Sequence, residues 1–363
     1  MTLVSGKHEM NNIAWKFAIL LLGVTSSLVA NAEAPYLAGL TYQPVKSVKF
    51  TGNTVQTLNR GDTLHPVFSP NGRYLAFTRV VVRDETEFGE AGYLDLVTGK
   101  TTILLDANSS KKYAVYSSFV YHIAWLDNSR VEFSISDGDV DSSIITFNVS
   151  HNKEVGLRHS GADDEAVPTK EYDELAVRFA SSFPGLESHF PGMLQQGVHL
   201  PPNRWVFQKD YANQDNHVWM LDRSADRPQV LLKLPDRNWH FALRQVIARG
   251  KDLLLVIAHE NSVSLVLLDK KGVRIIDRLP TDNHQSVTAR QMGGKHDVYF
   301  TVSSGHVRTR DPAFLYRWNE GGLRKLVTRN NIIEADVSAN GKHAALVSWE
   351  GERRVIEVAR IGR

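Results

Sequence analysis

Four polar side chains that lie far apart in the chain have the chemistry of a shared ligand site. They are His65, His122, Gln196 and Glu334. Imidazole, carboxylate and amide groups together suit a divalent transition metal, and the same groups can orient a bound peptide through hydrogen bonds. Whether the four side chains meet depends on the elements that carry them, and an internal repeat makes those elements comparable.

The repeat is clearest near the N-terminus. Residues 65–77, HPVFSPNGRYLAF, combine two short apolar segments with a Pro-Asn-Gly turn, a pattern typical of a β-hairpin. Residues 91–97 and 101–105 follow as two further strands on either side of a Thr-Gly-Lys turn. Four short strands in a meander of about 40 residues form one blade of a β-propeller.

Five further stretches repeat the pattern, over residues 122–158, 196–233, 243–279, 287–328 and 334–361. The last stretch is one strand short. Residues 57–73 match residues 326–342 without a gap, so residues 54–59 occupy a fourth-strand position before the first blade begins. The sequence therefore predicts an all-β fold, a six-bladed β-propeller closed by its N-terminal strand. An all-β sandwich is the alternative, and the internal repeat argues against it.

The repeat register places the four polar residues together. His65 and His122 stand at the same blade position, Gln196 stands at the equivalent place in the third blade, and Glu334 in the sixth. This position begins the innermost strand, so we expect the side chains to converge near one mouth of the central channel. The metal candidates are His65, His122 and Glu334, with a water-filled channel as the alternative.

Two segments carry a family resemblance. HPVFSPNGRYLAF and EADVSANGKHAAL, residues 334–346, resemble the repeat of TolB-type propellers, whose blades typically open with P-x-F/W-S-P-D-G-x-x-I/L-A-F. The resemblance implies a six-bladed periplasmic propeller, here without the α/β domain that TolB carries before its propeller. Prolyl-oligopeptidase-type peptidases share the repeat, but they need a G-x-S-x-G nucleophile motif that this sequence lacks, which excludes serine peptidase activity.

The N-terminal residues predict export. Residues 17–30, FAILLLGVTSSLVA, form an apolar run after Lys16, and Ala30-Asn31-Ala32 has the small-x-small form of a signal-peptidase site. We expect a signal peptide over residues 1–32 and a mature propeller over residues 33–363, periplasmic or secreted, with no membrane span. An uncleaved anchor or a buried core helix is the alternative.

Composition narrows the chemistry. The chain has no cysteine, which removes disulfides, thiolate catalysis and cysteine-based zinc sites. Its 42 basic and 40 acidic residues are scattered, so no basic stripe predicts nucleic-acid binding. One insertion, residues 159–191, interrupts the meanders between the second and third blades, and apolar residues at helical spacing predict a short helix from about Thr169 to Ser182.

Two functions from different classes follow from these observations. The first is a non-catalytic scaffold that binds a protein or peptide partner at a propeller face, as the resemblance implies. The second is a metal-dependent propeller enzyme, a lyase or hydrolase that acts on a saccharide or similar ligand at the channel mouth, with the histidines as ligands. The sequence shows no catalytic set with a recognisable spacing, which favours the scaffold.

Overall fold

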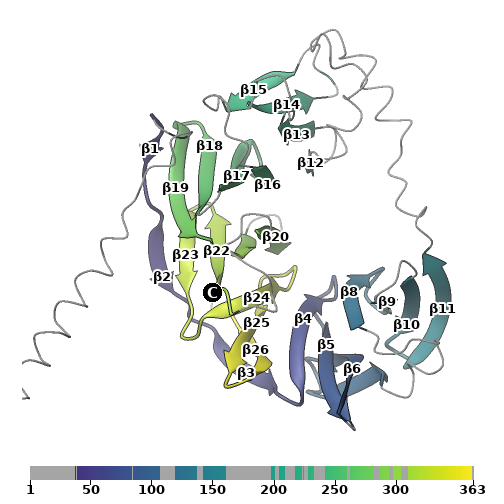
Figure 1. Ribbon diagram of the computed structural model, residues 1–363. Coiled ribbons are helices and arrows are strands. Elements are labelled where there is room, and N and C mark those ends of the chain that lie inside the picture. The colour runs from purple at the N-terminus through teal and green to yellow at the C-terminus, as the bar shows by residue number, and fades with distance from the viewer. Residues whose placement is uncertain are drawn as a thin grey trace, which may run out of the picture. The chain divides into compact units, whose positions relative to one another are not determined.

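The protein is described from a computed structural model, in which every regular element is a β-strand (Figure 1). The chain divides into two parts, Met1–Gly39 and Leu40–Arg363, and all the strands belong to the second. The structure describes residue 37 and residues 39–83, 85–106, 119–136, 142–160, 198–200, 204–208, 217–222, 224, 228–232, 242–259, 262–281, 287–293, 297–303 and 310–361. Within these ranges no helix has the length and hydropathy needed to cross a bilayer. The helix expected from about Thr169 to Ser182 lies outside them.

Most strands are grouped as antiparallel meanders of four that follow the chain. The first two meanders comprise β4 (Asp62–Phe68), β5 (Tyr74–Arg83), β6 (Thr86–Asp95) and β7 (Thr101–Leu105), then β8 (Phe119–Trp125), β9 (Arg130–Ser136), β10 (Ser142–Asn148) and β11 (Lys153–Ser160). The third and fourth comprise β12 (Val198–Leu200), β13 (Arg204–Gln208), β14 (Val218–Asp222) and β15 (Gln229–Leu232), then β16 (Ala242–Arg249), β17 (Asp252–His259), β18 (Ser262–Asp269) and β19 (Gly272–Pro280).

The fifth meander contains β20 (Thr288–Gly293), β21 (Val298–Ser303), β22 (Ala313–Asn319) and β23 (Gly322–Val327). The sixth contains β24 (Ile332–Val337), β25 (His343–Glu350) and β26 (Arg353–Arg360), and its fourth strand comes from the other end of the chain. That strand is β3 (Asn53–Leu58), which pairs antiparallel with β26. It covers the stretch for which the sequence predicts an outer strand of the last meander.

The hairpins of the first and sixth meanders turn in the same way because they share their turn residues. Asn71 Oδ1 accepts the Ser69 hydroxyl at 2.8 Å, and Asn340 Oδ1 accepts the Ser338 hydroxyl at 2.9 Å. The glycine after each asparagine has a positive φ, 69° and 67° respectively, which a residue without a Cβ adopts at little cost. The repeat that is visible in the sequence is therefore a repeat of local hydrogen bonding.

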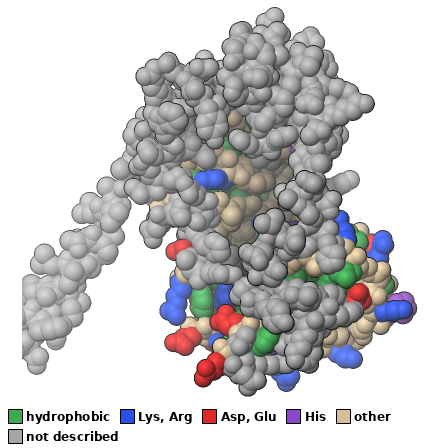
Figure 2. Space-filling view, turned by 45° about the vertical axis from the view of Figure 1, so that its right-hand side comes forward, with side chains coloured by type: hydrophobic (Ala, Val, Ile, Leu, Met, Phe, Trp, Pro, Cys, Tyr) green, Lys and Arg blue, Asp and Glu red, His purple; other side chains and the backbone are tan. Residues whose placement is uncertain are grey.

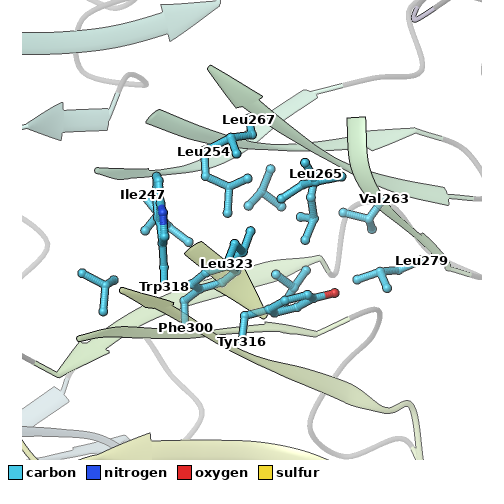
Figure 3. Close-up of a cluster of buried hydrophobic side chains, with 14 of the residues drawn as sticks. Ile247, Leu254, Val263, Leu265, Leu267, Leu279, Phe300, Tyr316, Trp318 and Leu323 are labelled. Atoms are coloured by element: carbon cyan, nitrogen blue, oxygen red, sulfur yellow. The ribbon is translucent and has the colours of Figure 1, made fainter. Parts of the chain in front are cut away.

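The hydrophobic core lies between neighbouring meanders. Figure 3 shows the junction of the fourth and fifth, where Leu254 and Leu265 of one meander face Phe300 and Trp318 of the other. Similar buried clusters join the first meander to the second, the fifth to the sixth, and the sixth to the first. First strands also meet, since β4 contacts β8 and β24, and β20 contacts β16 and β24. The two ends of the repeat are thus packed against each other.

An N-terminal strap, residues 41–58, runs along the outer strands of three successive meanders. Its strands are β1 (Thr41–Tyr42), β2 (Lys46–Lys49) and β3. β1 pairs parallel with β19, β2 pairs parallel with β23, and β3 pairs antiparallel with β26. The strap therefore covers outer edges that would otherwise present unpaired backbone groups.

Two apolar side chains anchor the strap. Val45 packs against the cluster between the fourth and fifth meanders, and Phe50 packs against the cluster between the fifth and sixth. The Phe50 backbone N–H donates to the Val327 carbonyl at 2.8 Å. These anchors sit at the places where the strap passes from one meander to the next, so each contributes to holding two meanders together.

We expect Phe50→Ala to lower the free energy of unfolding by about 1–3 kcal/mol, because a half-buried aromatic ring leaves an apolar junction. Lys49→Ala, at the neighbouring exposed position, is the matched control and should change it by less than about 0.5 kcal/mol. Urea denaturation of the two variants and the wild type measures the difference. Equal midpoints for both variants would mean that the strap adds nothing to the junction.

Candidate functional site

The candidate site forms where the first strand of the last meander, β24, meets the first strand of the first, β4. His65 lies in a β-bulge of β4, where the pairing with β5 shifts between Leu64 and Val67. Its φ is 53°, a left-handed conformation in which histidine is found more often than most non-glycine residues. Bulges of this kind re-aim the backbone and side chain, and they are frequent beside functional sites.

Glu334 of β24 contacts both the backbone and the side chain of His65 in this bulge. Its Oε2 accepts the backbone N–H of His65 at 2.9 Å, and its Oε1 lies 3.3 Å from His65 Nδ1. The His65 side chain is 29% exposed and that of Glu334 15%. One carboxylate therefore holds both the backbone and the ring of His65, with the ring partly open to solvent.

Asp336, two residues further along the same strand, repeats this arrangement. Its Oδ2 accepts the backbone N–H of Phe68 at 2.7 Å, and its side chain is buried. Burial raises the pKa of Asp336 to about 6, a shift that the nearby Arg290 cation and the Phe68 N–H only partly oppose. The two carboxylates thus bind the backbone of β4 at two residues, His65 and Phe68.

Arg290 of β20 completes the cluster from the fifth meander. Its guanidinium nitrogens lie 3.6 Å from Asp336 Oδ1 and 4.0 Å from Glu334 Oε1, and its side chain is 41% exposed. The sequence pattern did not identify Arg290 or Asp336 as site residues. In the ungapped match Asp336 stands opposite the apolar Val67, and a carboxylate in place of a valine was a usable signal.

The sequence-predicted residues have different outcomes. His65 and Glu334 are in direct contact, as their shared register predicted. His122 is exposed on β8, a strand that touches β4, and it makes no hydrogen bond or ion pair to another described residue. Gln196 lies outside the described residues. Within the described ranges, no three His, Asp or Glu side chains are grouped so that they could hold a metal ion.

The chemistry of the cluster is that of hydrogen-bonded recognition. Each carboxylate accepts a backbone N–H of β4 and so helps to hold that strand in place. The groups that remain accessible are the His65 ring and the Arg290 guanidinium. Elsewhere, Lys and Arg side chains lie among Asp and Glu side chains on the described surface shown in Figure 2, with no field of a single sign.

A second polar cluster, between the fourth and fifth meanders, contrasts with the first. Asp277 Oδ2 accepts the Tyr316 hydroxyl at 2.8 Å and the Lys325 ammonium at 2.9 Å. Tyr316 is fully buried, which raises its pKa well above the ordinary value. Because its central hydroxyl has no access to solvent, we interpret this cluster as a structural bond between meanders.

Solved structures with a similar fold include β-propeller domains. The chain resembles the β-propeller domain of the Trilobed protease from Pyrococcus furiosus, with 14% identity over 83% of this chain and 82% of that one and a TM-score of 0.32. It also resembles the Dos1 propeller, with 9% identity over 86% and 96% and a TM-score of 0.32. For the Pyrococcus horikoshii acylaminoacyl peptidase the identity is 9% over 87% of this chain and 48% of that one, with a TM-score of 0.32.

The chain thus spans about half of that peptidase. Neither the models of protein families nor the sequences of curated proteins give a match. At these identities and TM-scores the likeness concerns the fold alone, and nothing about chemistry or partners follows from it.

The raised pKa of Asp336 predicts a dependence of stability on pH. Between its ordinary value of 3.8 and about 6, the folded chain holds a proton that the unfolded chain has released. The free energy of unfolding should therefore fall as the pH rises through this window, by about 3 kcal/mol for a shift of this size. Asp336→Asn keeps an acceptor for the Phe68 N–H but cannot ionise, so it should lack this loss.

Urea denaturation of wild type and Asp336→Asn at intervals between pH 2 and 7 measures the sign of this change in the free energy of unfolding. The variant should gain stability relative to wild type as the pH rises. Asp95→Asn is a control of opposite sign: although burial acts against it, Arg73 and nearby backbone N–H groups hold the pKa of Asp95 below its usual range. That variant should lose stability relative to wild type as the pH rises through the acid range. If the free energies of unfolding of Asp336→Asn and wild type differ by the same amount at every pH, the raised pKa of Asp336 is contradicted.

Proposed function

We propose that the six meanders close into a six-bladed β-propeller, with β3 as the outer strand of the sixth blade. The support is the antiparallel pairing of β3 with β26, together with the apolar cluster between the sixth and first meanders. Contacts between successive first strands, including β24 with β4, agree with inner strands that follow one another around a common axis.

We propose further that this propeller is an exported scaffold that binds a protein or peptide partner at the face containing His65 and Arg290. The observation that carries the proposal is that the carboxylates of the cluster bind the backbone of β4, while its ring and its guanidinium do not. Glu334 and Asp336 each accept a backbone N–H of β4, whereas the His65 ring and the Arg290 guanidinium remain partly exposed beside them. Carboxylates that hold the strand in place beside a partly exposed imidazole and guanidinium form an arrangement that suits hydrogen-bonded recognition of a ligand.

Partner capture tests the binding proposal. Cells that express the chain with an affinity tag are cross-linked, and co-purified proteins are compared for wild type, Arg290→Ala and Arg73→Ala. Arg73 is the matched control, an exposed arginine paired with Asp95 in the first hairpin, away from the cluster. For a partner that binds at this face, the recovered amount should fall at least about fivefold with Arg290→Ala, the loss expected for one charge-assisted hydrogen bond. With Arg73→Ala the recovered amount should stay unchanged. If equal amounts of the partner co-purify with both variants, the proposed binding site is refuted.

Export is tested separately. If residues 1–32 are a signal peptide, the intact mass of the protein in a periplasmic extract should correspond to a chain that begins at Glu33, because Ala30 and Ala32 are the small residues that signal peptidase accepts. An Ala32→Trp variant should slow this cleavage. A mature mass that still includes residues 17–30 would instead indicate an anchored protein.

A further inference from the structure

The His65 ring is held in one tautomer by its surroundings. Nδ1 lies 3.3 Å from both oxygens of Glu334, and a carboxylate can only accept a hydrogen bond. The neutral ring therefore carries its proton on Nδ1, and the lone pair is on Nε2. Nε2 has no hydrogen bond to another described residue, so a hydrogen-bond acceptor of fixed orientation is left unused.

Arg290 offers the complementary group. Its two carboxylate contacts, at 3.6 and 4.0 Å, are ion pairs that are too long for hydrogen bonds, and its guanidinium makes no hydrogen bond to another described residue. Its planar group of N–H donors is therefore available while the carboxylates restrain its position. Glu334 Oε1 is the common neighbour of His65 Nδ1 and Arg290, so the His65 ring and the Arg290 guanidinium both lie against one carboxylate oxygen.

We propose that His65 and Arg290 together recognise a primary amide of the partner, the side chain of Asn or Gln. The amide N–H on the same side as the carbonyl oxygen donates to His65 Nε2, and the carbonyl accepts from the Arg290 guanidinium. Glu334 is a positioning residue that acts through the ring of His65. This inference rests on the proposed function and names the chemical group at that site.

The charges around the site favour a neutral group of this kind. A carboxylate ligand would approach Glu334 and Asp336 as well as the lone pair of Nε2, and like charges at this separation repel. A cationic ligand would meet Arg290. A primary amide carries no net charge and offers an N–H donor and a carbonyl acceptor on the same side, which matches the two exposed groups.

The tautomer is tested first, without any ligand. Long-range nitrogen–proton NMR of the histidine rings at pH 8 should show Nδ1 of His65 protonated and Nε2 as the bare nitrogen. His151 is the internal reference for the same tautomer, because its Nδ1 faces the amide oxygen of Asn148, which can likewise only accept a hydrogen bond. A His65 ring protonated on Nε2 would overturn the proposal, because no acceptor would then be presented.

Amide recognition is tested with N-acetyl-tetraalanine amide, an uncharged peptide that ends in a primary amide, and with acetate as the charged comparison. The His65 Nε2 resonance should move with the peptide in a saturable way and should respond less to acetate. Arg290→Ala should weaken the peptide affinity about fivefold to tenfold, the effect of one lost hydrogen bond, and Arg73→Ala should leave it unchanged. No response to the peptide at millimolar concentration, or a stronger response to acetate, would refute the inference.

His65→Asn separates recognition from folding. Asparagine tolerates a positive φ, and its amide can still donate to Glu334, but it has no atom at the place of Nε2. We expect this variant to keep the wild-type unfolding midpoint and to lose peptide binding. Peptide binding without partner capture would count against the scaffold proposal alone, whereas capture without peptide binding would count against amide recognition alone.

Discussion

The structure depends on one packing constraint, that a four-stranded sheet with apolar side chains on both faces needs a neighbour on each. In this chain the core is a set of clusters between successive meanders rather than one central mass. The first and last meanders would each keep one bare face unless they met. The cluster that contains Phe77 of β5 and Val347 of β25 satisfies this requirement, and it brings together residues from opposite ends of the chain.

That meeting of chain ends explains both the strap and the candidate site. Because the sixth meander lacks a strand of its own, β3 must return from the N-terminus, and β1 and β2 cover two further outer edges on the way. On the first strands, β4 pairs with β5 on one side only, and Glu334 and Asp336 accept the N–H groups of His65 and Phe68. Bonds across the junction are thus made by side chains, where strand pairing cannot make them.

The burial of Asp336 shows that this junction is not optimised for stability alone. An ionised carboxylate with so little exposure carries a desolvation cost that the ion pair with Arg290 does not fully offset, as the raised pKa records. The same carboxylate helps to hold an arginine whose donors remain available. In the cluster of Asp277, by contrast, the polar groups satisfy one another around the fully buried Tyr316 hydroxyl.

Local sequence determined a large part of this structure. The asparagine-glycine turns at residues 71–72 and 340–341 form the same hydrogen bonds because turn chemistry is contained in a few adjacent residues. The ungapped match between residues 57–73 and 326–342 was sufficient to predict a strand beside β26 and to place His65 and Glu334 at equivalent positions. Such inferences succeed when the repeat itself carries the spatial information.

Only the tertiary structure decided the rest. β1 and β2 are parallel additions of two and four residues, and such short segments have no periodicity that could identify their partners. Arg290 reaches the site from a strand whose register in the repeat is approximate, so its proximity to Asp336 depends on how the meanders pack. Equivalent positions predicted that His65 and Glu334 are neighbours, but it is the bulge and the left-handed φ of His65 that make one carboxylate bind both its backbone and its ring.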